Sequence, residues 1–198
     1  MINVNKISKY FDSKIVLSNF SLKIQENKKY GLMGDNGSGK TTLLKIIGNL
    51  MIPDKGKIIS INNPSVFYVS NNYRSFFLRL NGWENLFYFG ALNGKSKEEV
   101  EDFIESFFSS FDHQNILSKI ANTLSVGQIQ IVAMMRALLT EPDLLLIDEV
   151  ITNLDSNNSE KILDVLEIIG HKNRNFSYIN CSHNKDLLNK TCDEIIVI

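Results

Sequence analysis

The segment Gly34–Thr41, with the sequence GDNGSGKT, constrains the fold of this 198-residue chain more than any other part. The preceding residues, 29–33, favour a strand, and residues 41–50 have the spacing of an apolar-faced helix. Three glycines in between allow a tight backbone turn. The sequence therefore predicts a strand–loop–helix unit, which needs a sheet and a covering helical layer.

Apolar patterning elsewhere supports an α/β fold. Apolar residues alternate in 2–7 and 15–24, and no helix pattern separates these two strands, so they are predicted to form an antiparallel ribbon. Continuous apolar runs such as 144–147 predict parallel strands that are buried on both faces. The predicted strands are residues 2–7, 15–24, 57–61, 66–70, 144–147, 176–181 and 194–198. Residues 98–111 have the rhythm of a one-faced helix. We expect one domain, 1–198, with a helical subdomain at about 71–140 and ligands beyond the carboxyl ends of the strands.

Composition excludes some classes of protein. The net charge of −1 gives no basic field for nucleic acid. No apolar run approaches the roughly 18 residues that span a bilayer, and the N-terminus lacks the apolar segment of a secretory signal, so a cytosolic chain is expected. Cys181 and Cys192 suggest neither a disulfide nor a metal pair, and both are expected to be buried thiols.

The Gly-rich segment has the P-loop spacing of Gly, four residues, Gly, Lys and Ser or Thr. In such a loop the backbone N–H groups and the helix N-terminus hold phosphate, the lysine reaches the β- and γ-phosphates, and the threonine hydroxyl binds Mg²⁺. The predicted nucleotide-binding residues are Gly34, Asp35, Asn36, Gly37, Ser38, Gly39, Lys40, Thr41 and Thr42, with Thr41 also a metal ligand. The alternative is an ordinary Gly-rich turn that caps a helix.

Two acids follow the apolar run at 144–147. At the end of a buried strand, Asp148 would hold Mg²⁺ and Glu149 would polarise the attacking water. Without a P-loop upstream, such acids would be read as solvated loop residues.

The segment LSVGQ, Leu124–Gln128, looks like the signature motif of ABC ATPases, and it stands between the P-loop and the acids as in that family. The chain thus resembles the ATP-binding proteins of ABC transporters from Ile2 to Ile198. The resemblance implies a RecA-like P-loop core with an antiparallel β subdomain and a helical insertion. It also implies ATP and Mg²⁺ as cofactors, and ATP hydrolysis in a head-to-tail homodimer or ABC heterodimer. Ser125, Gly127 and Gln128 would then bind the nucleotide held by the other subunit.

Other elements of the resemblance carry further roles. Leu154 and Asp155 are similar to the family's D-loop, and His183 falls where the family has a switch histidine, so the implied catalytic residues are Lys40, Glu149 and His183. Phe11 would stack on adenine, with Tyr10 as the second choice. Asn71 stands where the family has a metal-contacting Gln; one methylene shorter, it reaches the metal only if its loop shifts inward.

The chain departs from the family pattern at several places, none of which removes a reacting group. Val126 replaces the usual Gly of the signature, and Val150 and Ile151 replace the Pro and Thr that follow the acids. The stretch between residues 57 and 66 is short, and the chain ends at Ile198. We expect a minimal version of the domain or a truncated piece of one.

The resemblance also implies a separate transmembrane permease subunit and a location at the inner face of the membrane. The segment 67–89 holds nine aromatics, which form either the groove for a short helix of that subunit or a local core. RLNGWENL, Arg79–Leu86, resembles export-type and peptide-resistance ATPases and favours export. The alternatives are a soluble ABC ATPase of a non-membrane assembly and a nucleotide-sensing module with low turnover. A small-molecule kinase would not account for LSVGQ.

Overall fold

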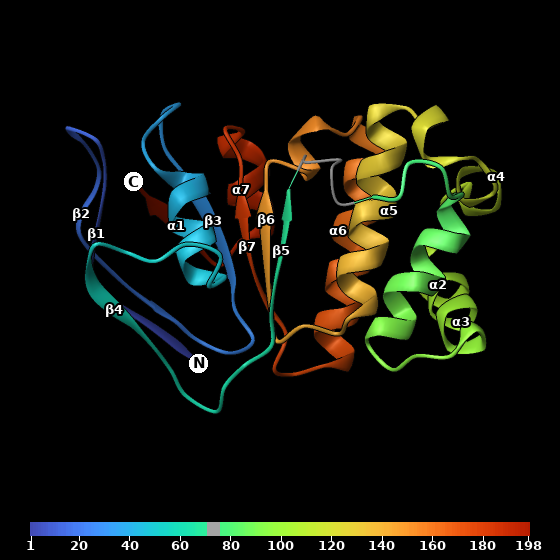
Figure 1. The fold of residues 1–198 in the computed structure, drawn as a ribbon, viewed down its shortest axis with the longest axis horizontal. Coiled ribbons are helices and arrows are strands. Elements are labelled where there is room, and N and C mark those ends of the chain that lie inside the picture. Colours follow the sequence, from blue (N-terminus) through green and yellow to red (C-terminus); the bar gives the residue numbers. More distant parts are fainter. Residues whose placement is uncertain (71–75) are drawn as a thin grey trace. The chain divides into compact units, whose positions relative to one another are not determined.

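The structure is a computed structural model that describes residues 1–70 and 76–198. The chain forms two compact units (Figure 1). The first unit comprises Met1–Tyr68, Pro142–Glu149 and Gly170–Ile198; the second comprises Val69–Glu141 and Val150–Ile169. The predicted helical insertion, at about 71–140, falls within Val69–Glu141 of the second unit. This unit also includes Val150–Ile169, which follows the two acids.

The N-terminal strands form the predicted antiparallel ribbon. It is a three-stranded sheet in the order β2 (Lys14–Ile24), β1 (Ile2–Phe11) and β4 (Lys55–Ser60). The register pairs Ile2 with Ile24 at one end and Phe11 with Lys14 at the other. The turn between β1 and β2 therefore consists of only two residues.

The second sheet is the mostly parallel one that the apolar runs predict. Its order is β5 (Val66–Ser70), β6 (Leu144–Asp148), β7 (Ser177–Cys181), β3 (Lys29–Met33) and β8 (Glu194–Val197). The pairs β6–β7, β7–β3 and β3–β8 are parallel. All residues of β6 and β7 are buried, as expected for central strands covered on both faces.

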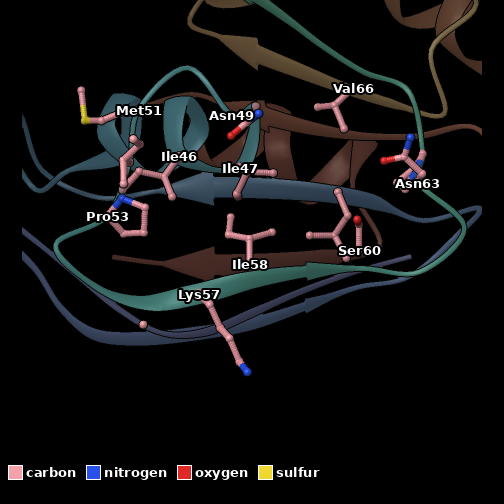
Figure 2. A pocket seen from close by; sticks show the side chains of 15 residues that line it. Ile46, Ile47, Asn49, Met51, Pro53, Lys57, Ile58, Ser60, Asn63 and Val66 are labelled. Carbon is pink, nitrogen blue, oxygen red and sulfur yellow. The ribbon is translucent and has the colours of Figure 1, made fainter.

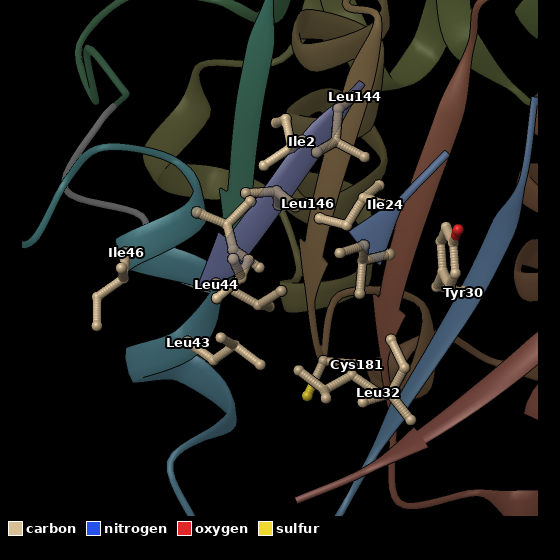
Figure 3. Close-up of a cluster of buried hydrophobic side chains, with 14 of the residues drawn as sticks. Ile2, Ile24, Tyr30, Leu32, Leu43, Leu44, Ile46, Leu144, Leu146 and Cys181 are labelled. Atoms are coloured by element: carbon tan, nitrogen blue, oxygen red, sulfur yellow. The ribbon is translucent and has the colours of Figure 1, made fainter. Parts of the chain in front are cut away.

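The core of the first unit combines both sheets with α1 (Lys40–Ile47), as Figure 3 shows. Leu43 and Leu44 of α1 share one apolar cluster with Leu146 of β6 and Ile2 of β1. On β3, a Cβ added to Gly31 would lie 3.2 Å from the Cβ of Leu188 in α7 (Lys185–Thr191), so the glycine permits close packing of this helix. Burial of these apolar side chains is the main source of stability here.

The second unit is helical. It contains α2 (Gly82–Leu92), α3 (Lys97–Phe108), α4 (His113–Ser118), α5 (Val126–Leu139), most of α6 (Ser156–Lys172) and two short 3₁₀ turns, Ala121–Thr123 and Ile151–Asn153. Capping boxes start α2 and α3, in which Asn81 and Ser96 accept from the third helical N–H. Within the described part of the chain, no helix is long and apolar enough to cross a membrane.

The two cysteines differ in their environment. Cys181 is fully buried, as predicted, whereas Cys192 is only partly buried, so the prediction for Cys192 is wrong. Cys192 follows the end of α7, and the two residues after it, Asp193 and Glu194, are exposed.

Candidate functional site

The P-loop joins β3 to α1 through glycines in the left-handed region. Gly37 has φ of +80° and Gly39 has φ of +107°. A Cβ on Gly39 would also lie 2.9 Å from the carbonyl oxygen of Val16. Conformation and space thus both require glycine at position 39.

Two side chains of this loop, those of Ser38 and Lys40, face inward, whereas Asp35 and Asn36 are exposed. Lys40 is 6% exposed, and its Nζ donates to the carbonyl oxygens of Gly34 and Asp35 at 2.9 Å each. The Oγ of Ser38 is buried and has no hydrogen-bond partner among the described residues. Because a buried unsatisfied hydroxyl is costly, this group fits a site that is completed by an anionic ligand.

A cavity of about 440 Å³ lies at the loop, within the range of small-molecule sites. It is lined by Lys14, Val16, Asn36, Gly37, Gly39, Lys40, Thr41, Thr42 and Glu149. Residues of the loop, of α1 and of the segment after β6 are therefore brought together, as the sequence predicts. Lys14 and Val16, from β2, were not predicted to lie there.

The two acids have different environments. Asp148 is 7% exposed, and its Oδ2 accepts a hydrogen bond of 2.7 Å from the Tyr68 hydroxyl. The Oε1 of Glu149 lies 2.7 Å from Nε2 of His183. The backbone N–H of Glu149 donates to the carbonyl of Cys181 at 3.2 Å, and its φ is +59°. A left-handed glutamate is uncommon and is held here by this local hydrogen bonding.

The donor set at the loop suits magnesium. The hydroxyl of Thr41 and the carboxylate of Asp148 are the oxygen ligands that Mg²⁺ prefers. In residues 1–70 and 76–198 no group of three or more His, Cys, Asp or Glu side chains could hold a metal ion, so a bound Mg²⁺ would take most ligands from phosphate and water. Asn71, the third predicted ligand, lies outside the described residues.

Burial and the neighbouring Asp148 raise the pKa of Cys181 to about 12, which keeps this thiol protonated.

The signature motif caps a helix of the second unit. The Oγ of Ser125 accepts from the N–H of Gln128, and Oε1 of Gln128 accepts from the N–H of Ser125, which forms a capping box at the start of α5. A Cβ on Gly127 would lie 3.8 Å from Leu154, within ordinary contact distance. Ser125 and Val126 are exposed. The N-terminus of α5 is thus accessible to an anion that is bound by another molecule.

The predicted adenine contact lies outside the P-loop cavity. Phe11 is 44% exposed at the end of β1, and Nζ of Lys9 lies 5.7 Å from its ring centroid. Lys14, which pairs with Phe11 between β1 and β2, lines the cavity, whereas Phe11 does not. The ring of Tyr10 is covered by Lys55 at 5.8 Å. Stacking of Phe11 on adenine stays a prediction.

Sequence reasoning missed three residues of this region, which are Lys14, Val16 and Tyr68. Lys14 and Val16 follow the predicted Phe11 within one hairpin, so a two-residue turn would have indicated their proximity to it. Tyr68 was counted only among the aromatics of its segment. Its position on the strand beside the acid that is predicted to bind metal depends on strand order, which local patterning does not give.

A larger cavity of about 640 Å³ lies between α1 and β4 (Figure 2). Its lining is mainly apolar, with Ile46 and Ile47 facing Ile58, and Lys57 points away from it. Because the amine of Lys57 points away, no cationic side chain of its lining is directed into it, unlike at the P-loop. The smaller cavity at the P-loop is therefore the candidate site.

Comparison with known proteins agrees with this geometry. Residues 17–152 match the family model described as ABC transporter. The chain is 31% identical over its full length to YcbN of Bacillus subtilis (strain 168), an ABC transporter ATP-binding protein, and spans 66% of that relative. It is 30% identical to the zinc import ATP-binding protein ZnuC of Wigglesworthia glossinidia brevipalpis, with 100% and 82% of the two chains covered.

Solved structures show the same fold. The structure described as the ATP binding subunit of an ABC transporter superposes with a TM-score of 0.89 at 24% identity, over 100% of this chain and 85% of the other. A nucleotide-free ATP-binding cassette from an ABC transporter gives a TM-score of 0.81 at 21% identity, over 100% and 87%. With a family match over more than half its length, the chain belongs to the ABC transporter ATP-binding family, whose domains bind and hydrolyse ATP.

Proposed function

We propose that this chain is the subunit that hydrolyses ATP to power a separate transmembrane subunit, and that it works as a dimer closed by ATP. The observation that carries the proposal is the position of Glu149. It lines the cavity of the P-loop lysine, and its carboxylate lies 2.7 Å from His183. A carboxylate held beside a phosphate-binding loop can accept a proton from an attacking water.

Several of the predicted residues have a role in this scheme. The P-loop amides and Lys40 bind the β- and γ-phosphates, and Thr41 and Asp148 hold Mg²⁺. When bound, Mg²⁺ neutralises phosphate charge as the leaving group departs. Glu149 takes the proton of the attacking water, and His183 orients Glu149 through their contact.

In the dimer, the second copy of the chain supplies the remaining contacts to the bound nucleotide. Ser125, Gly127 and Gln128 lie at the exposed start of α5. A helix N-terminus favours a negative charge, so this motif would contact the γ-phosphate bound by the other copy. Closure of the dimer then depends on ATP, because ADP lacks the γ-phosphate that would contact both subunits.

An aromatic surface on the second unit supports a protein partner. Phe77 and Tyr88 are 43% and 45% exposed, and their rings meet edge to face at 4.7 Å. In the same unit, the guanidinium of Arg136 lies 4.5 Å from the ring centroid of Phe76 and 4.6 Å from that of Phe89. Burial lowers the pKa of Arg136 to about 10. Phe76 is thus part of a local core, and we propose the exposed pair of Phe77 and Tyr88 as an anchor for a short helix of the membrane subunit.

The direction that we propose is export, which rests on the likeness of Arg79–Leu86 to export-type ATPases. Three relatives are named as import ATP-binding proteins, for zinc, Fe(3+) ions and methionine. Through its membrane subunit, the chain would act at the inner face of the cell membrane.

Phosphate release from the purified chain with ATP and Mg²⁺ tests the enzymatic part of the proposal. Turnover that rises on reconstitution with the membrane subunit supports coupling, and Tyr88→Ala should remove the rise but leave the basal rate. ATP binding with no turnover, alone or with the partner, would favour a nucleotide-sensing module. Turnover without any membrane partner in a pull-down would favour a soluble ABC ATPase.

A further inference from the structure

The P-loop cavity has a second ammonium group on its wall. Lys14 lines it together with Lys40 and Thr41. A Cβ built on Gly37, in the middle of the loop, would lie 3.9 Å from Nζ of Lys14. The amine of Lys14 therefore reaches the part of the loop whose N–H groups surround phosphate.

The position of Lys14 is set by the hairpin. It pairs with Phe11 across a two-residue turn, and Asp12 in this turn has φ of +51°. A turn this short fixes the start of β2 relative to the end of β1. The backbone of Lys14 is thus held in place by the hairpin. Less conformational entropy is therefore lost when the amine of Lys14 binds a ligand.

The two lysines differ in what they already bind. Nζ of Lys40 donates to two loop carbonyls, which occupies two of its three protons. Lys14 is exposed, and no side chain in residues 1–70 and 76–198 forms an ion pair with it. The cavity is therefore lined by a lysine that forms no ion pair with a described side chain, beside a loop built for anions.

We propose that Lys14 is a second phosphate-binding lysine, which contacts the phosphate chain of the nucleotide from the hairpin opposite Lys40. This inference rests on the proposed function, because it takes the cavity to be the nucleotide site. Lys14 sets nucleotide affinity and takes no part in the chemistry. Since it meets the phosphate chain, it acts on ATP and ADP alike.

The test is calorimetric titration of the full chain with ATP in EDTA, which prevents turnover, and with ADP. Lys14→Met keeps the length of the stem and removes the charge, and it should raise the dissociation constants of both nucleotides about fivefold, the upper range for an exposed ion pair. Lys14→Arg should retain most of the affinity. Because exposed charges are screened, the difference between wild type and Lys14→Met should shrink when salt is raised from about 0.05 to about 0.5 M.

Lys23→Met is the matched control. Lys23 is exposed on the same strand, does not line the cavity, and should bind nucleotide as the wild type does. If the wild type binds and Lys14→Met binds equally well, the inference is wrong and the proposed function is unaffected. If the wild type binds neither nucleotide, the proposed function itself fails. Equal losses in Lys14→Met and Lys23→Met would show a general charge effect and would also overturn the assignment.

Discussion

Replacement of Glu149 by Gln tests the assignment of the catalytic base most directly. Gln keeps the shape of the side chain and an oxygen that can accept from Nε2 of His183, 2.7 Å away. It cannot accept the proton of the attacking water. General base catalysis contributes about 10²- to 10⁴-fold, which corresponds to about 2.7–5.5 kcal/mol of barrier, so turnover should fall by that factor.

The structure shows that this loss would not reflect unfolding. The side chains of Glu149 and His183 are 36% and 41% exposed, and even a fully charged contact with this exposure would contribute about 1 kcal/mol at most. For a chain of this size, 1 kcal/mol shifts the melting temperature by about 2–4 °C. A rate loss of two orders of magnitude with so small a shift can arise only from the lost base.

The assay combines three measurements on wild type and Glu149→Gln. Phosphate release gives turnover, calorimetry with ATP in EDTA gives affinity, and size-exclusion chromatography with ATP and Mg²⁺ gives the oligomeric state. Affinity should be unchanged, because Lys40 and Thr41 are intact. ATP that is not hydrolysed should hold the dimer closed, and Ser125→Arg in the same background should abolish the dimer by filling the opposing phosphate site.

A variant that hydrolyses ATP within about tenfold of the wild-type rate would refute Glu149 as the base. A variant that binds ATP and neither hydrolyses it nor dimerises, even when co-expressed with the membrane subunit, would refute the proposed dimer and favour the sensing module.

Three further predictions follow from the same site. Lys40→Ala should weaken ATP binding by about 1.5–3 kcal/mol, the value of a charge-assisted hydrogen bond, and unchanged affinity in calorimetry would contradict the P-loop assignment. Phe11→Ala should weaken ATP and ADP alike by about 1 kcal/mol if the ring stacks on adenine, whereas an effect on ATP alone, or none, would favour Tyr10 or no stacking. Tyr68→Phe removes the hydroxyl that donates to Asp148, so the Mg²⁺ concentration for half-maximal turnover should rise while ATP affinity in EDTA stays the same; a loss of affinity in EDTA would show that Tyr68 acts on the nucleotide instead.

The sequence by itself determined the chemistry of the loop and most of the elements. The prediction of phosphate binding by Gly34–Thr41 depends on residues that are adjacent in the chain, and their spacing is a local property. A buried strand was likewise predicted at 144–147 and is observed at Leu144–Asp148, because an uninterrupted apolar run must be covered on both faces. Val66–Ser70 was predicted with its observed bounds. Helix ends were less accurate, as α1 stops at Ile47 before Gly48.

Local patterning could not separate the roles of the aromatics. Phe76 and Phe77 are neighbours in the sequence, yet one is 7% exposed beside Arg136 and the other 43% exposed beside Tyr88. Which of them becomes core depends on the path of the chain into α2, and the sequence pattern does not encode that path.

Contacts between distant residues were decided only by the tertiary structure. Tyr68 and Asp148 are 80 positions apart, and they meet because β5 and β6 are adjacent in the sheet. Lys14 reaches the P-loop because the hairpin of β1 and β2 brings the start of β2 to the loop. Strand order and hairpin placement follow from how the whole core packs, and no local spacing of residues specifies them. The sequence therefore predicted which groups would bind phosphate, whereas the packed fold determined which additional side chains reach them.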